Sequence, residues 1–170
     1  LKQFYDKGLV YKGFKVVQKL IPEIQKPDEV KIKIIATAIC GTDVGIYSAK
    51  DSLKDSMMIL ETPDVIVGHE FSGKIVDAGS KAKPQLAKLM IEQAIGKAPV
   101  KKFVKGRSPI QLARDPELIN ILDKYFYCSA EMHVTCGTCV QCKAGERHVC
   151  RNTIIRGLHG NGSYAEFVTL

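Results

Sequence analysis

Alternating apolar and polar positions predict strands toward both ends of the chain. In the clearest case, the run Val30–Ile34 alternates apolar residues with two lysines, as expected for a strand with one buried face. Shorter apolar runs predict further strands at residues 15–21, 65–67, 75–76, 125–128 and 165–170. Short strands with frequent glycines are typical of a β-barrel or a β-sandwich, so we expect a mainly β fold.

The stretch from 83 to 122 follows a helical period instead. A first helix is predicted after Pro84, a residue that suits a first helical turn, with its end near Gly96. A second is predicted after Asp115 and Pro116, which are typical N-cap and N1 residues. Its apolar face is formed by Leu118, Ile119, Leu122 and Tyr125. We therefore expect a helical insertion whose apolar face packs on the rest of the domain, on another domain or on a second subunit.

Composition describes an ordinary globular chain. Of its 170 residues, 45% are hydrophobic and 25% are charged, and that length suits one domain with an addition. The sequence has no apolar run near the ~20 residues of a membrane span and no signal-peptide pattern at its start, so we expect a cytoplasmic protein without a membrane partner. The net charge of +7 is concentrated in residues 81–107, where eight basic residues accompany one acid.

Four of the six cysteines are clustered, at positions Cys136, Cys139, Cys142 and Cys150. This spacing is typical of metal ligation in a reducing compartment rather than of disulfides. Four thiolates complete the tetrahedral shell of Zn²⁺ and leave no open position, so the segment 136–150 is predicted to hold a structural zinc. An iron–sulfur cluster is the alternative, although ferredoxin-type runs have a shorter last gap that is followed by proline.

A second group of candidate ligands lies at Cys40 and at His69-Glu70. A cysteine and a histidine from separate strand ends can hold zinc while leaving a coordination position open. Asp43 can orient the imidazole of His69 from the second shell of such a site, and Thr42 supplies a hydroxyl two residues from the cysteine. Taken alone, a buried cysteine is more often a packing residue than a ligand.

These motifs resemble those of the zinc-dependent medium-chain alcohol dehydrogenases. The run from Gly68 to Gly73 is similar to the zinc signature of that family, and Ile39–Asp43 to its first zinc-ligand motif. The four-cysteine segment resembles its structural zinc lobe, and Gly162–Phe167 resembles the strand that closes its catalytic domain. The resemblance covers roughly residues 12–82 and 123–170. Within the family, the segments around Cys136 and Cys150 are most similar to L-threonine dehydrogenases and to sorbitol and other polyol dehydrogenases.

The resemblance implies a GroES-like β-barrel over residues 1–170, with a helical insertion at 83–122 and a zinc-binding lobe at 136–150. It implies that Cys40 and His69 are catalytic zinc ligands, that Glu70 is a near or alternating ligand, and that Thr42 starts a proton relay. The implied reaction is oxidation of a small secondary alcohol. Zinc lowers the pKa of the bound alcohol, and a hydride passes to NAD or NADP.

Two departures from the family affect these expectations. The sequence contains no Gly-x-Gly-x-x-Gly after a strand, so the Rossmann cofactor domain and a third catalytic zinc ligand are expected outside these residues. We expect the chain alone to be inactive, and we expect the complete enzyme to form a homo-oligomer. Gly45 occupies a position at which threonine and sorbitol dehydrogenases commonly carry histidine, which leaves the substrate open.

The rival interpretation is a non-catalytic zinc-ribbon module that contacts nucleic acid or a protein through its basic segment. A ribbon module has no need of Cys40, Thr42 or His69, so these residues favour the dehydrogenase. The basic segment contains a single aromatic residue, Phe103, and thus lacks the stacking platform expected for single-stranded nucleic acid.

Overall fold

The structure, a computed structural model, describes residues 13–53 and 65–170, so the parts of the expected domain at 1–12 and 54–64 lie outside the described residues. The chain forms two compact units. The first comprises residues 1–19, 37–71 and 130–165, and the second comprises residues 20–36, 72–129 and 166–170. Within the described ranges, no helix combines the length and the apolar character needed to cross a membrane.

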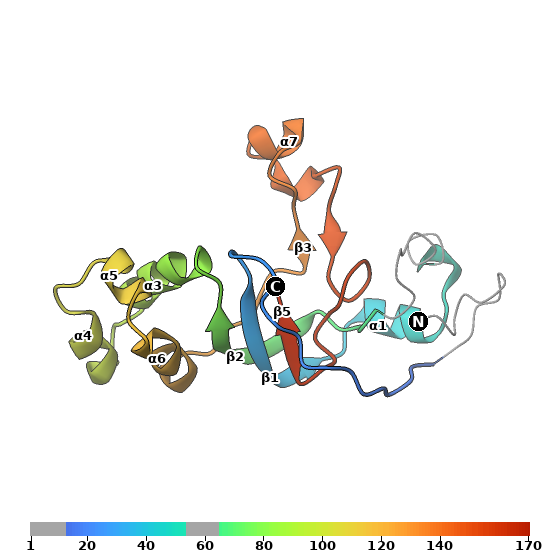
Figure 1. Cartoon of the computed structure of the whole chain (residues 1–170). Helices are drawn as coiled ribbons and strands as arrows, with labels where there is room; N and C mark the ends of the chain where they lie inside the picture. The colour runs from blue at the N-terminus through green and yellow to red at the C-terminus, as the bar shows by residue number, and fades with distance from the viewer. Residues whose placement is uncertain (1–12, 54–64) are drawn as a thin grey trace. The chain divides into compact units, whose positions relative to one another are not determined.

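The principal sheet contains β1 (Val30–Ala38), β2 (Glu70–Ala78) and β5 (Phe167–Thr169), in the order β2-β1-β5 (Figure 1). Strands β1 and β5 are antiparallel, and Ile32 lies opposite Val168. Both of these side chains are buried, as the alternating pattern of β1 predicts. Among the described residues this sheet stays open and does not close into a barrel.

Three of the predicted strands are wrong. Residues 15–21 and 65–67 have no strand, and residues 125–128 contribute only an isolated bridge between Cys128 and Gly73. The backbone at 65–67 is instead bonded to a turn, because Gly162 donates to the Ile66 carbonyl at 2.7 Å and Tyr164 donates to the Val67 carbonyl at 2.9 Å. An apolar run can thus be buried and hydrogen-bonded without forming a regular ladder.

The first unit contains α1 (Gly41–Tyr47) and a small lobe. In the lobe, β3 (His133–Val134) pairs with β4 (Ile154–Ile155), and the chain between them forms α7 (Val140–Lys143) and the 3-10 helix η3 (Arg147–Val149). The lobe is thus a two-stranded stem that carries the loop with the four clustered cysteines (Figure 1).

In the second unit, residues 82–125 form helices α3 (Ala82–Glu92), α4 (Ala98–Val104), α5 (Pro109–Ala113) and α6 (Glu117–Tyr125). The two predicted helices are confirmed as α3 and α6. Asp115 accepts a hydrogen bond from the Glu117 amide at 2.8 Å, as expected of a residue that caps a helix start. The helices α4 and α5 were not predicted, because seven and five residues are too few to show a helical period.

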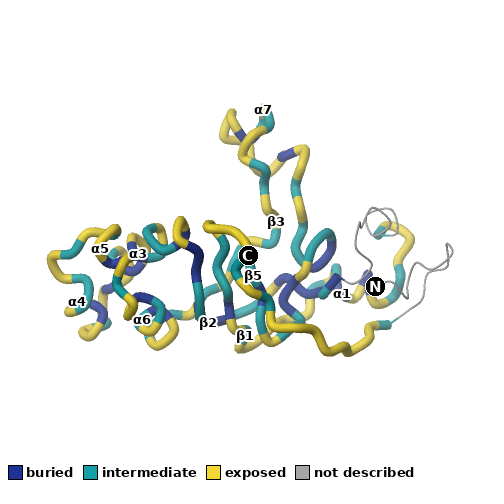
Figure 2. Tube along the Cα trace, in the orientation of Figure 1, coloured by how far each residue is buried: buried dark blue, intermediate teal, exposed yellow. Residues whose placement is uncertain are grey.

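Much of the apolar surface of this helical segment is already buried. Figure 2 shows buried positions on each of its helices, and the buried set is Ala82, Ala87, Met90, Ala94, Val100, Leu112, Leu118 and Leu122. Helix α3 packs against both α4 and α5. On the α6 face that was expected to need a partner, Leu118 and Leu122 are therefore buried within the folded chain, whereas Ile119 and Tyr125 are half-buried.

Replacing Leu118 with alanine should lower the free energy of unfolding by about 2–5 kcal/mol, since a leucine that is 1% exposed leaves a cavity when it is truncated. The matched control is Leu89→Ala on α3, at a side chain that is 49% exposed, where we expect a change of about 0.5 kcal/mol or less. Urea unfolding of both variants measures the difference. Equal transition midpoints would show that α6 is not packed into a core.

Candidate metal centres

The four clustered cysteines converge in the lobe. Cys136 follows β3, Cys139 precedes α7, Cys142 lies within α7, and Cys150 follows η3. Their sulfur atoms all lie within 4.8 Å of one another. The loop can fold so tightly because it contains Gly137, which adopts a φ of 69° that favours glycine. This sequence-predicted set is therefore brought together in space.

The surroundings of these sulfurs suit a bound cation. The Cys136 amide donates to the Cys150 Sγ, and the Cys139 amide donates to the Cys136 Sγ, both at 3.4 Å. Hydrogen bonds from Thr138 lower the pKa of Cys136 to about 5, whereas burial and the neighbouring thiols raise the pKa of Cys142 to about 12. Burial thus disfavours the Cys142 thiolate in the absence of metal, and a divalent cation bound among the four sulfurs would stabilise it.

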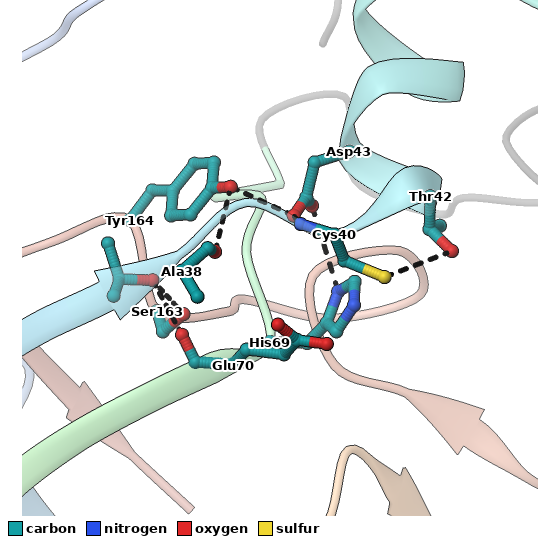
Figure 3. Close-up of polar contacts among 9 residues, drawn as sticks. Ala38, Cys40, Thr42, Asp43, His69, Glu70, Ser163 and Tyr164 are labelled. Carbon is teal, nitrogen blue, oxygen red and sulfur yellow. Dashed lines mark hydrogen bonds and ion pairs between the residues drawn. The ribbon is translucent and has the colours of Figure 1, made fainter.

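The second group of candidate ligands forms where the start of α1 meets the start of β2, and residues 40–43 and 69–70 all belong to the first unit (Figure 3). Cys40 immediately precedes α1, His69 immediately precedes β2, and Glu70 is the first residue of β2. One ligand atom from each of these residues lies within 4.8 Å of the other two. Cys40 is half-buried, His69 is buried and Glu70 is exposed, so the group lies at the edge of the protein interior.

Asp43 connects the two segments that carry these ligands. Its side chain is 1% exposed. Its Oδ2 accepts a hydrogen bond from the Cys40 amide at 2.9 Å, and its Oδ1 faces the Nδ1 of His69 at 3.7 Å. A carboxylate beside one ring nitrogen fixes the orientation of a histidine and directs the other nitrogen toward a metal. Asp43 therefore lies beside the ring that it is predicted to orient, and the orienting role itself stays a prediction.

The His69 ring passes a simple test of fit to zinc. Its Nε2 is buried and has no hydrogen-bond partner among the described residues, and the side chain is 6% exposed. A buried polar atom without a partner is unfavourable in a native protein. A zinc ion held jointly with the Cys40 sulfur would satisfy this nitrogen, and cysteine, histidine and carboxylate are all zinc ligands.

Other residues of the motif surround this group. The Thr42 hydroxyl lies 4.0 Å from the Cys40 sulfur and is partly exposed. Gly45 is buried in α1, where an added Cβ would meet the Leu53 side chain at 2.7 Å. A histidine at this position would displace Leu53, so this helix is packed around the glycine.

Three glycines allow the segment before His69 to approach its neighbours. Gly68 has a φ of 88°, and an added Cβ there would overlap the Tyr164 ring. A Cβ on Gly162 would overlap the Gly68 carbonyl oxygen, and one on Gly157 would lie 2.5 Å from the same atom. These backbones are in direct contact, and any side chain at the three positions would push His69 away from Cys40.

Sequence reasoning missed three side chains that support the site. The Tyr164 hydroxyl lies 2.8 Å from the Asp43 Oδ2, and burial together with this carboxylate raises the pKa of Tyr164 above its ordinary value. The Thr37 hydroxyl lies 2.8 Å from the Glu70 carbonyl oxygen and 3.2 Å from the Ser163 Oγ. The run Gly162–Phe167 was the only signal for Ser163 and Tyr164, and it indicated a strand rather than contacts with the site.

Comparison with known proteins agrees with this geometry. Residues 26–106, which include both Cys40 and His69, match the alcohol dehydrogenase GroES-like domain. The GroES-like fold expected from the sequence is confirmed, with the difference that the described strands form open sheets.

Relatives of this GroES-like domain extend the match along the chain. The chain is 31% identical to an L-threonine 3-dehydrogenase from Caldanaerobacter subterraneus, over 99% of the chain and 35% of the relative. It is 32% identical to an L-threonine 3-dehydrogenase from Pyrococcus furiosus, over 93% of the chain and 33% of the relative. The chain thus spans about a third of the length of these relatives.

Solved structures show the same fold. The galactitol-1-phosphate dehydrogenase of Escherichia coli matches with a TM-score of 0.59 at 22% identity, over 94% of this chain and 33% of that one. A protein described as a zinc-binding dehydrogenase from Sinorhizobium meliloti, with NADP bound, matches with a TM-score of 0.52 at 28% identity, over 88% of this chain and 30% of that one.

Proposed function

We propose that this chain is the zinc-binding catalytic domain of an NAD(P)-dependent alcohol dehydrogenase that oxidises a secondary alcohol. The observation that carries the proposal is the grouping of a His69 ring nitrogen with the Cys40 sulfur and a Glu70 carboxylate oxygen, together with the buried, unpartnered Nε2 of His69. The similarity to L-threonine 3-dehydrogenases supports the same reaction class. A small polar alcohol such as L-threonine or a polyol is the substrate class that we propose.

In this proposal, Cys40 and His69 hold the catalytic zinc and Glu70 is a near or alternating ligand. Cys136, Cys139, Cys142 and Cys150 hold the structural zinc. A zinc ion with an open position acts as a Lewis acid, which lowers the pKa of a bound hydroxyl. The closed set of four cysteines leaves no such position, so its role is to stabilise the lobe.

Side chains around the open site orient the histidine ligand and transfer the proton. The Asp43 Oδ1 lies 3.7 Å from the His69 Nδ1, where the carboxylate favours the ring orientation that leaves Nε2 available as a ligand. The partly exposed Thr42 hydroxyl is placed near the Cys40 sulfur, where its oxygen can take the proton that an alcohol loses while its own hydroxyl proton passes to solvent water. The hydride acceptor is NAD or NADP, held by a Rossmann domain outside these residues.

Metal analysis tests the proposal directly. The purified protein should contain two zinc ions per chain, and Cys40→Ser should reduce this to one while the four-cysteine site stays filled. Cys128→Ser is the matched control, since Cys128 belongs to neither group of candidate ligands. An unchanged zinc content in Cys40→Ser would contradict the catalytic site. Assays of the complete enzyme with L-threonine and polyols, each with NAD and NADP, then identify the substrate and the cofactor.

Replacing Thr42 with alanine should lower kcat of the complete enzyme by about 100-fold or more, because a group that transfers a proton typically contributes 10²–10⁴-fold. KM should change little, since the loss falls on the transition state. Thr42→Ser keeps the hydroxyl and should restore most of the rate. Steady-state kinetics of the two variants test this prediction, and full activity in Thr42→Ala would rule out a proton relay through Thr42.

The zinc-ribbon alternative is disfavoured, because it leaves the grouping of Cys40 and His69 without a purpose. Formation of a homo-oligomer and a cytoplasmic location stay predictions. Gel filtration with light scattering of the protein and of a variant lacking residues 84–121 would show whether the helical segment takes part in assembly.

A further inference from the structure

Tyr164 contacts both of the segments that carry the candidate zinc ligands. Its amide donates to the Val67 carbonyl at 2.9 Å, and the preceding Ser163 amide donates to the Gly68 carbonyl at 2.8 Å. The Tyr164 ring lies against Gly68, immediately before His69. Backbone and ring together therefore fix the chain that leads into the histidine.

The hydroxyl of Tyr164 reaches the other segment. It lies 2.8 Å from the Asp43 Oδ2 and 3.2 Å from the Ala38 carbonyl oxygen (Figure 3). A phenol has one proton to donate, and the shorter, charge-assisted bond goes to the carboxylate. The same Oδ2 accepts the Cys40 amide at 2.9 Å, so two donors hold this oxygen from different parts of the chain.

This arrangement determines where the second carboxylate oxygen points. With Oδ2 held by Tyr164 and Cys40, the Asp43 Oδ1 faces the His69 Nδ1. Asp43 is buried, so solvent water cannot readily replace the Tyr164 hydroxyl as a hydrogen-bond donor. We propose that Tyr164 is a positioning residue of the open zinc site, which sets the affinity of that site for metal by holding Asp43 against the His69 ring.

The inference rests on the proposed function, since it concerns the metal held by Cys40 and His69. Tyr164 acts through Asp43, because its hydroxyl bonds to that carboxylate and not to a candidate ligand atom. Its ring packs against the buried cluster of Ile46, Val67 and Leu158. Phenylalanine keeps this packing and removes only the hydroxyl, which makes Tyr164→Phe a clean substitution.

Cobalt titration of the metal-free protein tests the role. Co²⁺ bound to thiolates absorbs light, and the part of the absorbance that is lost in Cys40→Ser reports the open site. Tyr164→Phe should raise the dissociation constant of the open site for Co²⁺ by about 10- to 100-fold, the usual effect of losing an outer-shell partner. The part due to the four cysteines should not change, which also shows that the variant is folded. Tyr127→Phe, at an exposed tyrosine, is the matched control and should leave both parts unchanged.

A double-mutant cycle shows whether Tyr164 acts through Asp43. If it does, Tyr164→Phe should weaken Co²⁺ binding in the parent protein and add little in an Asp43→Asn background. An unchanged dissociation constant in Tyr164→Phe, or effects that add in the double variant, would overturn the inference while leaving the zinc site intact. A parent protein with no Cys40-dependent absorbance would instead contradict the proposed function, and this inference with it.

Discussion

Cys142→Ser should remove the structural zinc and lower the thermal midpoint of the protein by about 6 °C or more. Cys142 lies within α7 and is buried, so its sulfur cannot be replaced by a ligand from solvent without opening the lobe. Loss of a bound metal is among the few changes that exceed about 3 kcal/mol, and each kcal/mol shifts the midpoint by about 2–4 °C in a chain of this size.

Elemental analysis and thermal unfolding check this expectation together. The control is again Cys128→Ser, a cysteine outside the cluster whose sulfur contacts the Gly73 carbonyl oxygen at 3.5 Å. It should keep the full zinc content, because Cys128 is not a candidate ligand. Iron in place of zinc in the parent protein, accompanied by visible colour, would favour the iron–sulfur alternative. Zinc retained in Cys142→Ser would mean that the four sulfurs do not act as one set.

The sequence could predict which residues come together in the two groups of candidate ligands, because ligand chemistry depends on residue type and spacing. The four cysteines are separated by short gaps, so a local loop is sufficient to bring their sulfurs within 4.8 Å. Cys40 and His69 are further apart in sequence, and it was the motif around each residue, rather than its spacing, that indicated that they meet.

The sequence could not predict how that site is supported. The contact between Tyr164 and Asp43 joins residues 121 positions apart, and no periodic pattern records such a pair. The strand at residues 65–67 was wrongly predicted for a similar reason, since the backbone partners of these residues lie far away in the sequence, around Gly162. Helices α4 and α5 were missed for a local reason, because neither is long enough to show an amphipathic period.

His69→Asn should remove nearly all activity of the complete enzyme, by about 1,000-fold or more in kcat/KM. Lewis-acid stabilisation by a metal is worth several kcal/mol, and each 1.36 kcal/mol corresponds to a factor of ten in rate. The zinc content should fall by one ion per chain, because the open site would lose the one nitrogen ligand that it has among the described residues. Loss of activity and loss of one zinc are expected together.

His133→Asn is the matched control for this experiment. His133 lies in the lobe and its Nδ1 is 2.8 Å from the Glu131 carboxylate, on an exposed surface. The same substitution there should leave kcat/KM within about twofold and the zinc content unchanged, because an exposed ion pair contributes little. A His69→Asn enzyme that kept both zinc ions and its rate would place the open metal site elsewhere. The buried, unpartnered Nε2 would then need a different ligand.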